Sequence, residues 1–197
     1  MKTHSESEEN YIKALYHLGG GEAVSNGALA QRVGAKGPSA TQAVKRLAAK
    51  GLAEVIPYKG VKLTSDGLAL AKHILRKHRL WETFLVEKLG FGWEEVHPLA
   101  EQLEHVQSRE LVEKLATYLG SPIHDPHGDP IPQADGAIPP TMGNPLQQFS
   151  EGSRLRIVRV EDAGTDFFNQ LDQLNISLGK EFTLISISNF DSSIQLK

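Results

Sequence analysis

The segment that decides the fold is residues 25–63, SNGALAQRVGAKGPSATQAVKRLAAKGLAEVIPYKGVKL. Ser25 can cap a short helix over 26–32, because its side-chain oxygen can accept a hydrogen bond from the first helical turn. Pro38 suits the first turn of a second helix, which Gly51 ends. The sequence therefore predicts two helices separated by a tight turn.

A β-hairpin is predicted directly after these helices. The stretches 52–56 and 61–63 are short strands, and the Pro-Tyr-Lys-Gly loop between them contains a glycine. Another helix over 5–18 precedes the pair, with three glycines at 19–21 as its stop. This order of helices and hairpin is typical of a winged helix-turn-helix, which places the second helix of the pair in the DNA major groove.

The polar face of that second helix has the side chains that DNA recognition needs. Gln can bond an adenine edge through two hydrogen bonds, and Ser or Thr can bond bases or phosphates. Basic side chains add an attraction to phosphate that does not depend on sequence. A small helical domain with a solvated polar face is the alternative, which the Pro38 start, the Gly51 stop and the basic hairpin disfavour. The expected DNA-binding residues are Lys36, Pro38, Ser39, Thr41, Gln42, Lys45, Arg46 and Lys59, with phosphate attraction also from Lys62.

Composition limits the class of protein. The chain has 197 residues, a formal net charge of −3, eight His and no Cys. Without Cys there are no disulfides, thiolate zinc sites or cysteine nucleophiles. No apolar run reaches the roughly 18–20 residues that span a bilayer, and the polar, acidic first residues do not resemble a signal peptide, so a cytoplasmic protein is expected. Residues 1–63 carry +4, whereas 64–120 carry −2 and 121–197 carry −5, which suggests an anionic partner for the first third.

Proline placement divides the chain. Seven of the ten prolines fall between Pro122 and Pro145, so this stretch is predicted to be a linker. Three helices are expected before it, over about 64–89, 94–106 and 108–119, with Thr64 or Ser65 capping the first. Two half-buried strands are expected after it, at 154–160 and 181–187. The predicted parts are a DNA-binding domain at 1–63, a helical domain at 64–120, the linker at 121–145 and a small β part at 146–197.

Histidine and glutamate gather at helical spacing in the second part. His78 and Glu82 are four residues apart on one helix face, a pair that is also common on solvated faces. Carboxylate and imidazole without thiolate suit Mn²⁺ or Fe²⁺, with Zn²⁺ as a further option, and affinity should fall in acid because the ligands must be deprotonated. Within an arc of roughly 100° the next predicted helix carries a tetrad of ligand types, His97, Glu101, Glu104 and His105.

Five stretches carry a family resemblance: ENYIKALY at 9–16, GPSATQAV at 37–44, RKHRLWE at 76–82, the segment 96–106 and DPHGDPIP at 125–132. Together they resemble the diphtheria-toxin-repressor family over essentially the whole chain. The resemblance implies a metal-activated, homodimeric repressor of iron or manganese homeostasis. It also implies a mainly α protein with a small β part, in which a winged helix-turn-helix is followed by a helical dimerisation and metal-binding domain and an SH3-like (FeoA-like) barrel.

Two neighbouring metal sites are implied by the same resemblance. His78, Glu82 and His97 match the ligands of the family's ancillary site. The primary, DNA-activating site is matched by Glu101, Glu104 and His105, and is completed from the first helix near Asn10.

The expected metal follows from the residues at which this chain differs from particular members of the family. Iron-responsive members have Cys at the position of Glu101 and manganese-responsive members have a carboxylate, so Mn²⁺ is expected, with Fe²⁺ as the alternative and Zn²⁺ or Co²⁺ binding in vitro. Asn10 stands where well-known members have Met or Asp. Lys13 stands where the compact two-domain manganese regulators have a ligating Glu, so their closely paired dinuclear site is not expected here.

The third domain departs from the iron-type members as well. Their metal-binding Glu and Gln fall at Gly164 and Phe167, where Asp166 is the candidate substitute. Family third domains usually continue beyond the point that corresponds to Lys197, which leaves the completeness of the barrel open.

The expected function is a Mn²⁺-responsive repressor of metal-uptake genes that binds a palindromic operator on double-stranded DNA as a homodimer, without membrane, substrate or catalytic residues. An iron-responsive repressor of the same family is the alternative. A dinuclear metal hydrolase would need an open coordination position and a substrate cleft, and would leave the winged helix without a purpose. A metal-independent winged-helix regulator is the third reading.

Overall fold

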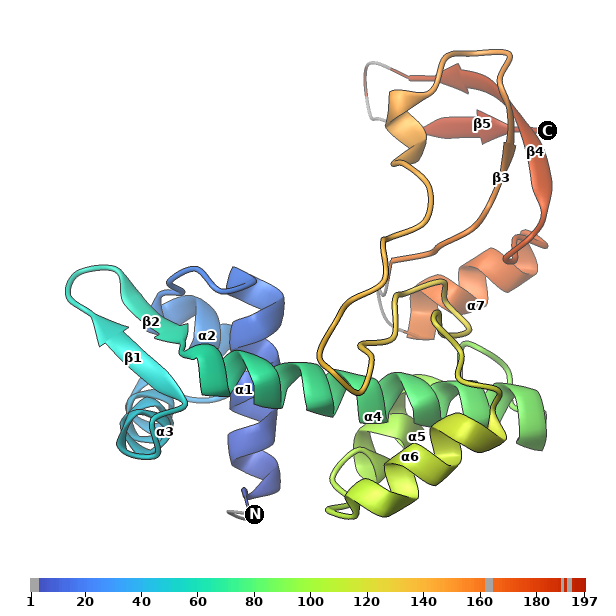
Figure 1. Cartoon of the computed structure of the whole chain (residues 1–197). Helices are drawn as coiled ribbons and strands as arrows, with labels where there is room; N and C mark the ends of the chain where they lie inside the picture. Colours follow the sequence, from blue (N-terminus) through green and yellow to red (C-terminus); the bar gives the residue numbers. More distant parts are fainter. Residues whose placement is uncertain (1–3, 162–164, 189, 191–192) are drawn as a thin grey trace.

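The computed structural model describes residues 4–161, 165–188, 190 and 193–197. A long helix, α4, joins a winged-helix part at one end to two shorter helices and a β part at the other (Figure 1). The elements in order are α1 (Glu6–Gly19), α2 (Asn26–Arg32), α3 (Gly37–Ala49), β1 (Ala53–Ile56), β2 (Gly60–Leu63), α4 (Ser65–Leu89), α5 (Val96–Leu103), α6 (Arg109–Tyr118), the 3-10 turn η1 (Leu146–Gln148), β3 (Arg154–Arg156), α7 (Thr165–Gln173), β4 (Glu181–Ile187) and β5 (Ile194–Leu196).

The predicted winged helix-turn-helix is confirmed. The Ser25 hydroxyl accepts a hydrogen bond from the Ala28 N–H and so caps α2, while Pro38 lies in the first turn of α3. The wing is an antiparallel hairpin of β1 and β2, with Ala53 opposite Leu63. One core fills the space between α1, α2, α3, the hairpin and the start of α4, and its α3 members are Ala40, Ala43, Val44 and Leu47.

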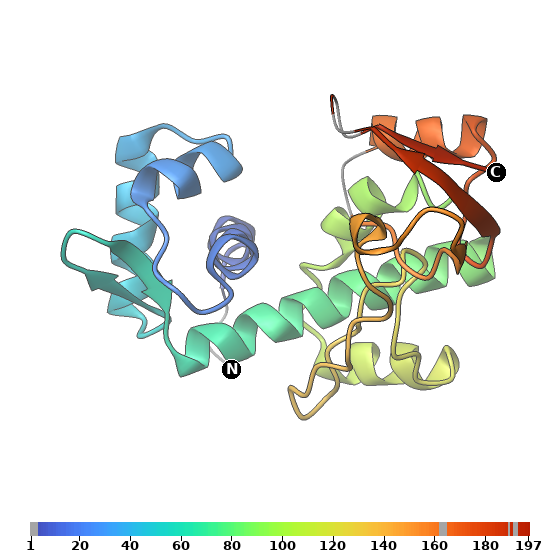
Figure 2. The same cartoon turned by 90° about the horizontal axis from the view of Figure 1, so that it is seen from above.

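Helix α4 fixes how the two ends of the molecule are placed. Its 25 residues correspond to about 37 Å of helix, and Figure 2 shows the winged helix at one end and the other elements at the opposite end. Thr64 caps α4 by accepting a hydrogen bond from the Gly67 N–H. A Cβ on Gly67 would lie 1.9 Å from the Leu52 carbonyl oxygen, so this position needs glycine to let α4 approach the wing.

Helix α5 is shorter than the predicted 94–106. It begins at Val96, because the ring of Pro98 would clash with the carbonyl of residue 94 if the helix extended further back. It ends at Leu103, with Glu104 as its C-cap and His105 beyond it. The expectation that all four members of the tetrad lie on one helix is therefore wrong for His105 and only marginally right for Glu104.

The proline-rich segment lies along the helical domain instead of forming elements of its own. Within the described residues, no regular helix or strand lies between α6 and η1, as the prolines predict. Its Ile131 is fully buried with Leu80 of α4 and with Val112 and Leu115 of α6. The Arg76 guanidinium donates a hydrogen bond to the Pro132 carbonyl at 3.0 Å, which fastens the segment to α4.

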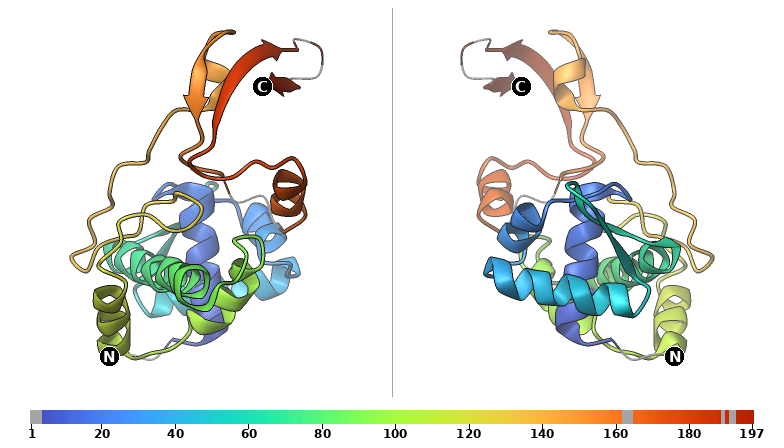
Figure 3. Two further views of the ribbon diagram at one scale, coloured as in Figure 1. Left: turned by 90° about the vertical axis from the view of Figure 1, so that its right-hand side faces the viewer. Right: turned by 90° about the vertical axis from the view of Figure 1, so that its left-hand side faces the viewer.

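The C-terminal part contains a three-stranded antiparallel sheet in the order β3-β4-β5, with α7 between the sheet and the helical domain (Figure 3). Strand β3 ends at Arg156, well before the predicted residue 160. Residues beyond it leave β4, and the Val160 N–H donates to the His127 carbonyl instead. The strands that the structure describes form an open sheet and no closed barrel, which is the incomplete form of the SH3-like domain that the sequence left open. Among the described helices, none is long and apolar enough to cross a membrane.

Candidate metal centre and DNA-binding face

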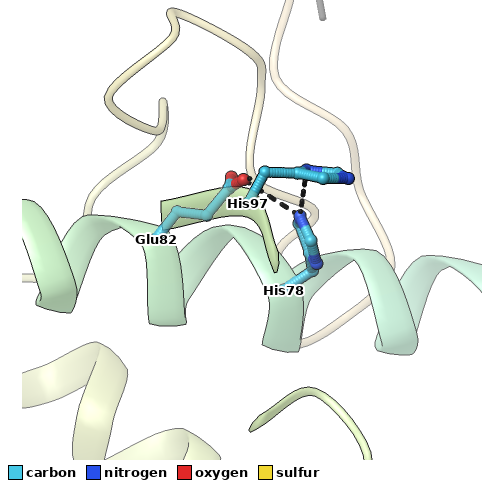
Figure 4. A group of neighbouring side chains, drawn as sticks. All are labelled: His78, Glu82 and His97. Atoms are coloured by element: carbon cyan, nitrogen blue, oxygen red, sulfur yellow. Dashed lines mark hydrogen bonds and ion pairs between the residues drawn. The ribbon is translucent and has the colours of Figure 1, made fainter. Parts of the chain in front are cut away.

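Three of the expected ligands meet where α4 faces the start of α5. The His78 Nε2 atom lies 3.0 Å from Glu82 Oε1 and 3.1 Å from His97 Nδ1, and His97 Nδ1 lies 3.3 Å from the same Glu82 oxygen (Figure 4). One potential ligand atom from each residue falls within 4.8 Å of the others. We call His78, Glu82 and His97 the histidine cluster. Its spacing is that of a group able to hold one divalent cation, and the assignment of these residues to an ancillary site stays a prediction.

Protonation in the histidine cluster follows from its charges. Both ring nitrogens of His78 face carboxylates, Glu104 at 2.5 Å and Glu82 at 3.0 Å. Burial lowers the pKa of His78, but the charge of Glu82 and the hydrogen bond to Glu104 outweigh it, and the pKa is raised. Burial raises the pKa of Glu82, yet His78 and the neighbouring imidazoles hold that pKa well below its usual value. A metal must therefore displace a proton from His78 before this ring can ligate.

A second group forms where α5 ends against α1. Glu104 is fully buried, and its Oε1 atom accepts a hydrogen bond from the Lys13 ammonium at 2.7 Å. The same ammonium lies 3.3 Å from Glu101 Oε1. We call Glu101, Glu104 and His105 the glutamate cluster. It contains the predicted primary-site residues, but their two carboxylates are bridged by a lysine of α1.

The charges in the glutamate cluster favour ionised carboxylates. The hydrogen bond with His97, reinforced by the positive charge of Lys13, lowers the pKa of Glu101 to about 2 although partial burial opposes this. Burial raises the pKa of Glu104, but the hydrogen bond with His78 and the charges of His78 and Lys13 outweigh it, so the pKa is lowered. Both glutamates are ready anionic ligands at neutral pH.

His105 of the glutamate cluster contacts α1 through a residue that the sequence reasoning missed. Its Nδ1 atom lies 2.7 Å from Oε2 of Glu9, and Gln107 donates to Oε1 of the same carboxylate at 2.8 Å. Glu9 is buried, and its carboxylate also lies 3.7 Å from the Lys77 ammonium. Asn10, the expected α1 ligand, is exposed, so its role stays a prediction. The signal for Glu9 was its place at helical spacing before Ile12, on the inward stripe of α1.

A third acidic and histidine group adjoins the histidine cluster. Glu82, Asp125 and His127 each offer a ligand atom within 4.8 Å of the others, and all three are buried. Asp125 Oδ1 accepts hydrogen bonds from the N–H groups of His127 and Asp129, both at 2.9 Å, and so stabilises a turn in the way typical of Asp side chains. Glu82 Oε2 lies 3.8 Å from His127 Nδ1, so the linker reaches the metal centre through the second oxygen of Glu82.

Asp125 and His127 of the linker are both shifted toward holding protons. Burial, and then the charge of Glu82, raise the pKa of Asp125 to about 7. For His127, burial lowers the pKa, but the hydrogen bond and charge of Glu82 outweigh it and raise the pKa to about 9. The His127 Nε2–H also donates to the Trp93 carbonyl at 2.8 Å.

The third domain meets this region through α7. The centroid of the Phe168 ring lies 5.0 Å from that of Trp93 and 4.8 Å from that of His127. The Trp93 indole N–H donates a hydrogen bond to Asp172 at 2.9 Å. Asp166, the expected substitute ligand, is exposed in the first turn of α7, as is Phe167, and Gly164 lies outside the described residues. A ligand from the third domain therefore stays a prediction.

Most of the expected DNA-binding residues are exposed. Thr41 is half-buried, and its hydroxyl donates to the Gly37 carbonyl of its own helix at 3.0 Å. Lys62 is paired with Glu54 at 2.9 Å, so its attraction for phosphate is partly neutralised. The remaining residues are exposed on α3, at its N-terminus or on the wing: Lys36, Pro38, Ser39, Gln42, Lys45, Arg46 and Lys59.

Comparison with known families identifies all three parts of the chain. Residues 3–61 match the model "Iron dependent repressor, N-terminal DNA binding domain", and residues 64–133 match "Iron dependent repressor, metal binding and dimerisation domain". Residues 144–197 match the FeoA domain.

Individual relatives agree with these matches. The chain is 38% identical to the iron-dependent repressor IdeR of Mycobacterium tuberculosis over 128 residues, which cover 64% of this chain but only 56% of that relative. It is 30% identical to the diphtheria toxin repressor of Corynebacterium diphtheriae over 94% of this chain and 87% of that protein.

Solved structures extend the likeness to the whole fold. A manganese-dependent transcriptional repressor in complex with manganese aligns with a TM-score of 0.86 at 34% identity, covering 96% of this chain and 89% of that one. ScaR with bound Zn²⁺ aligns with a TM-score of 0.81 at 33% identity over 96% and 89%.

Proposed function

This chain belongs to the diphtheria toxin repressor family, and we propose that it is a Mn²⁺-responsive repressor of metal-uptake genes that binds a palindromic DNA operator as a homodimer. The observation that carries the proposal is the position of the histidine and glutamate clusters. They adjoin each other through Glu104 and lie where α1, a helix of the DNA-binding part, meets α4 and α5. A change in charge there can alter how the DNA-binding part is held. A regulator of this kind works in the cytoplasm, where its operator is.

The metal is inferred from the donor atoms. Members of this family depend on divalent metals, and the relatives named above include an iron-dependent repressor and a manganese-bound one. In this chain the donors are carboxylate oxygens and imidazole nitrogens, with no Cys. Oxygen-rich sets suit Mn²⁺ better than the softer metals that thiolates select. An Fe²⁺-responsive repressor of the same family is the alternative, supported by the dependence of the mycobacterial relatives on iron.

We infer two sites for divalent ions. His78, Glu82 and His97, whose ligand atoms already converge, would hold one ion. Glu101, Glu104 and His105 would hold the other once Lys13 has moved, with Asn10 or the buried Glu9 adding an oxygen from α1. The metal would supply positive charge to the region where α1, α4 and α5 meet and where several carboxylates lie close together. The fit has one flaw, because the Lys13 ammonium already bridges Glu101 and Glu104.

The protein side of the switch is the attachment of α1. This helix packs in the core of the winged-helix part, and its Glu9 and Lys13 reach the residues at the end of α5. Firm attachment holds the winged helix, and so α3, in one orientation relative to the dimerisation helices. In a dimer, two fixed α3 helices can enter major grooves about one helical turn apart. Metal and operator then favour the same conformation, so each raises the affinity for the other.

DNA-binding anisotropy tests the proposal. A labelled palindromic operator is titrated with metal-stripped protein in chelator and then with Mn²⁺, Fe²⁺, Co²⁺ or Zn²⁺ added. We expect weak binding in chelator and strong binding with Mn²⁺. Binding that the chelator leaves unchanged would contradict the metal switch, and activation by Fe²⁺ but not Mn²⁺ would select the iron alternative. Lys114→Met, at an exposed pair with Glu110 on α6, is the matched control and should respond as the wild type does.

A further inference from the structure

Lys13 lies in the middle of the glutamate cluster although it comes from a different helix. Its ammonium is 2.7 Å from Glu104 Oε1 and 3.3 Å from Glu101 Oε1, so it touches one oxygen of each carboxylate. The lysine side chain is 13% exposed and the Glu104 side chain is fully buried. A positive group therefore already sits between the two carboxylates that are the expected oxygen ligands of the primary site.

The electrostatic reason for this arrangement is the burial of Glu104. A buried carboxylate is costly unless a cation or several hydrogen bonds compensate it. Glu104 receives its compensation from Lys13 on one oxygen and from His78 on the other. In a site of this kind a divalent metal would neutralise the same charges, so the ammonium and the metal are alternatives at the same oxygen atoms.

Lys13 differs in this respect from the partners in the histidine cluster. Within the described residues, Glu82 makes its ion pairs with His78, His97 and His127. The ligand atoms of His78, Glu82 and His97 already lie within 4.8 Å of one another, and an imidazole nitrogen can offer a lone pair to a metal. A protonated ammonium has three donors and no lone pair, so it cannot ligate and must move away. Its flexible four-carbon stem allows that movement toward solvent.

We propose that Lys13 is the resident cation of the glutamate cluster. It joins α1 to α5 in the metal-free protein, and a divalent metal must displace it to bind Glu101 and Glu104, after which a metal-ligating oxygen of Glu9 or Asn10 would replace the link to α1. The proposal rests on the metal-responsive function proposed above. It adds the residue that sets the metal concentration at which the glutamate cluster fills. Loading is then sequential. The histidine cluster fills first, and the glutamate cluster fills only at a metal concentration high enough to expel the ammonium.

The test is a Mn²⁺ titration of metal-stripped, full-length protein by isothermal calorimetry. The variants are Lys13→Met, which keeps the length of the side chain without its charge, and Lys13→Arg, which keeps the charge. Lys114→Met removes an exposed lysine that pairs only at the surface with Glu110, and serves as the control. Circular dichroism in chelator and in Mn²⁺ establishes that each variant is folded.

The wild type should bind a first Mn²⁺ tightly and a second one more weakly. In Lys13→Met the second affinity should rise by about tenfold or more, because no ammonium has to leave a buried carboxylate. Lys13→Arg should bind the second ion no more tightly than the wild type, since a guanidinium grips two carboxylates at least as well. In chelator, the melting temperature of Lys13→Met should fall below that of Lys114→Met.

Two results would overturn the proposal. One is a second Mn²⁺ affinity that Lys13→Met leaves unchanged or weakens. The other is a second Mn²⁺ that Lys13→Arg binds more tightly than the wild type does. This result decides the case if Lys13→Met fails to fold without metal. Anisotropy with the operator, measured on the wild type in parallel, tests the proposed function separately. The function is contradicted only if Mn²⁺ does not alter DNA binding, whatever the result for Lys13.

Discussion

The histidine cluster and the glutamate cluster adjoin each other, yet they balance their carboxylates with different groups. In the histidine cluster the charge of Glu82 is matched by imidazoles of His78, His97 and His127. In the glutamate cluster the Lys13 ammonium pairs with both Glu101 and Glu104, in addition to the imidazoles of His97 and His78. Imidazoles can change from proton carrier to ligand near neutral pH, whereas an ammonium cannot. Two donor sets of similar composition can thus differ in metal affinity because of one neighbouring side chain.

Glu104 belongs to both sides of this comparison, so its removal should have the largest effect. Glu104→Ala leaves the Lys13 ammonium and the charged His78 ring without their shared buried partner. We expect a loss of about 3–5 kcal/mol in the free energy of unfolding in chelator, measured by urea denaturation. Glu110→Ala on α6, at an exposed pair with Lys114, should change it by less than about 0.5 kcal/mol. A similar small loss for both variants would mean that the two clusters are not linked through Glu104.

His97 is an expected ligand of the histidine cluster only, although its Nε2 atom also lies 3.6 Å from Glu101 Oε1. His97→Ala should weaken the first Mn²⁺ by about 100-fold or more, since loss of an outer partner of a ligand already costs about 10–100-fold. Calorimetry measures this loss, and urea denaturation in chelator should show a much smaller change than Glu104→Ala gives. His124→Ala is the control, because His124 lies outside both clusters and its ring contacts the Pro140 carbonyl. If His97→Ala binds the first Mn²⁺ as tightly as the wild type, the histidine cluster is not the site of higher affinity.

The pH dependence of the metal-free protein tests the imidazole side of the comparison. Contact with Glu82 raises the pKa of His127 from 6.5 to about 9, so the folded state holds a proton that the unfolded state releases. The stabilisation is complete below about pH 6.5 and is lost as the pH rises through 9, by about 3 kcal/mol. Urea denaturation in chelator at pH 6 and pH 9 measures the loss. His127→Gln should flatten this part of the profile, and an equally steep decline in that variant would contradict the assignment.

Gln42 on α3 should give the smallest effect on the clusters and a separate effect on DNA. Its exposed side chain is far along the chain from both donor sets, so Gln42→Ala should leave both Mn²⁺ affinities unchanged. Operator affinity should fall by about 1–3 kcal/mol if the amide reads an adenine. Anisotropy with the operator and with a scrambled duplex measures this, and an equal loss on both duplexes would mean that Gln42 makes no base contact.

Local sequence signals located most of the fold. Ser25 and Thr64 cap the helices that they were expected to cap, because the hydroxyl of a capping residue acts over a few neighbouring positions. The same local logic, applied to Pro98, would have corrected the start of α5. Strand β3 was predicted too long because its last residues bond to the linker, a distant partner that alternation of apolar residues does not reveal.

The candidate site was only partly predictable for the same reason. Spacing of four on α4 brought His78 and Glu82 together, and the resemblance added His97. Nothing local to α1 shows that Lys13 points at Glu101 and Glu104, some ninety residues away in the chain. The family motif points to Asn10 as the ligand from α1, whereas the helical spacing of buried positions points to Glu9, which is the residue that contacts His105. Contacts between distant segments depend on packing that one-dimensional patterns do not encode.

The difference between the clusters is tested most directly by anomalous X-ray diffraction at the manganese edge, on crystals of the metal-stripped protein given one equivalent of Mn²⁺. We expect a single peak among His78, Glu82 and His97, with the Lys13 ammonium still between Glu101 and Glu104. A peak between Glu101, Glu104 and His105, with Lys13 turned away and the histidine cluster empty, would contradict this interpretation.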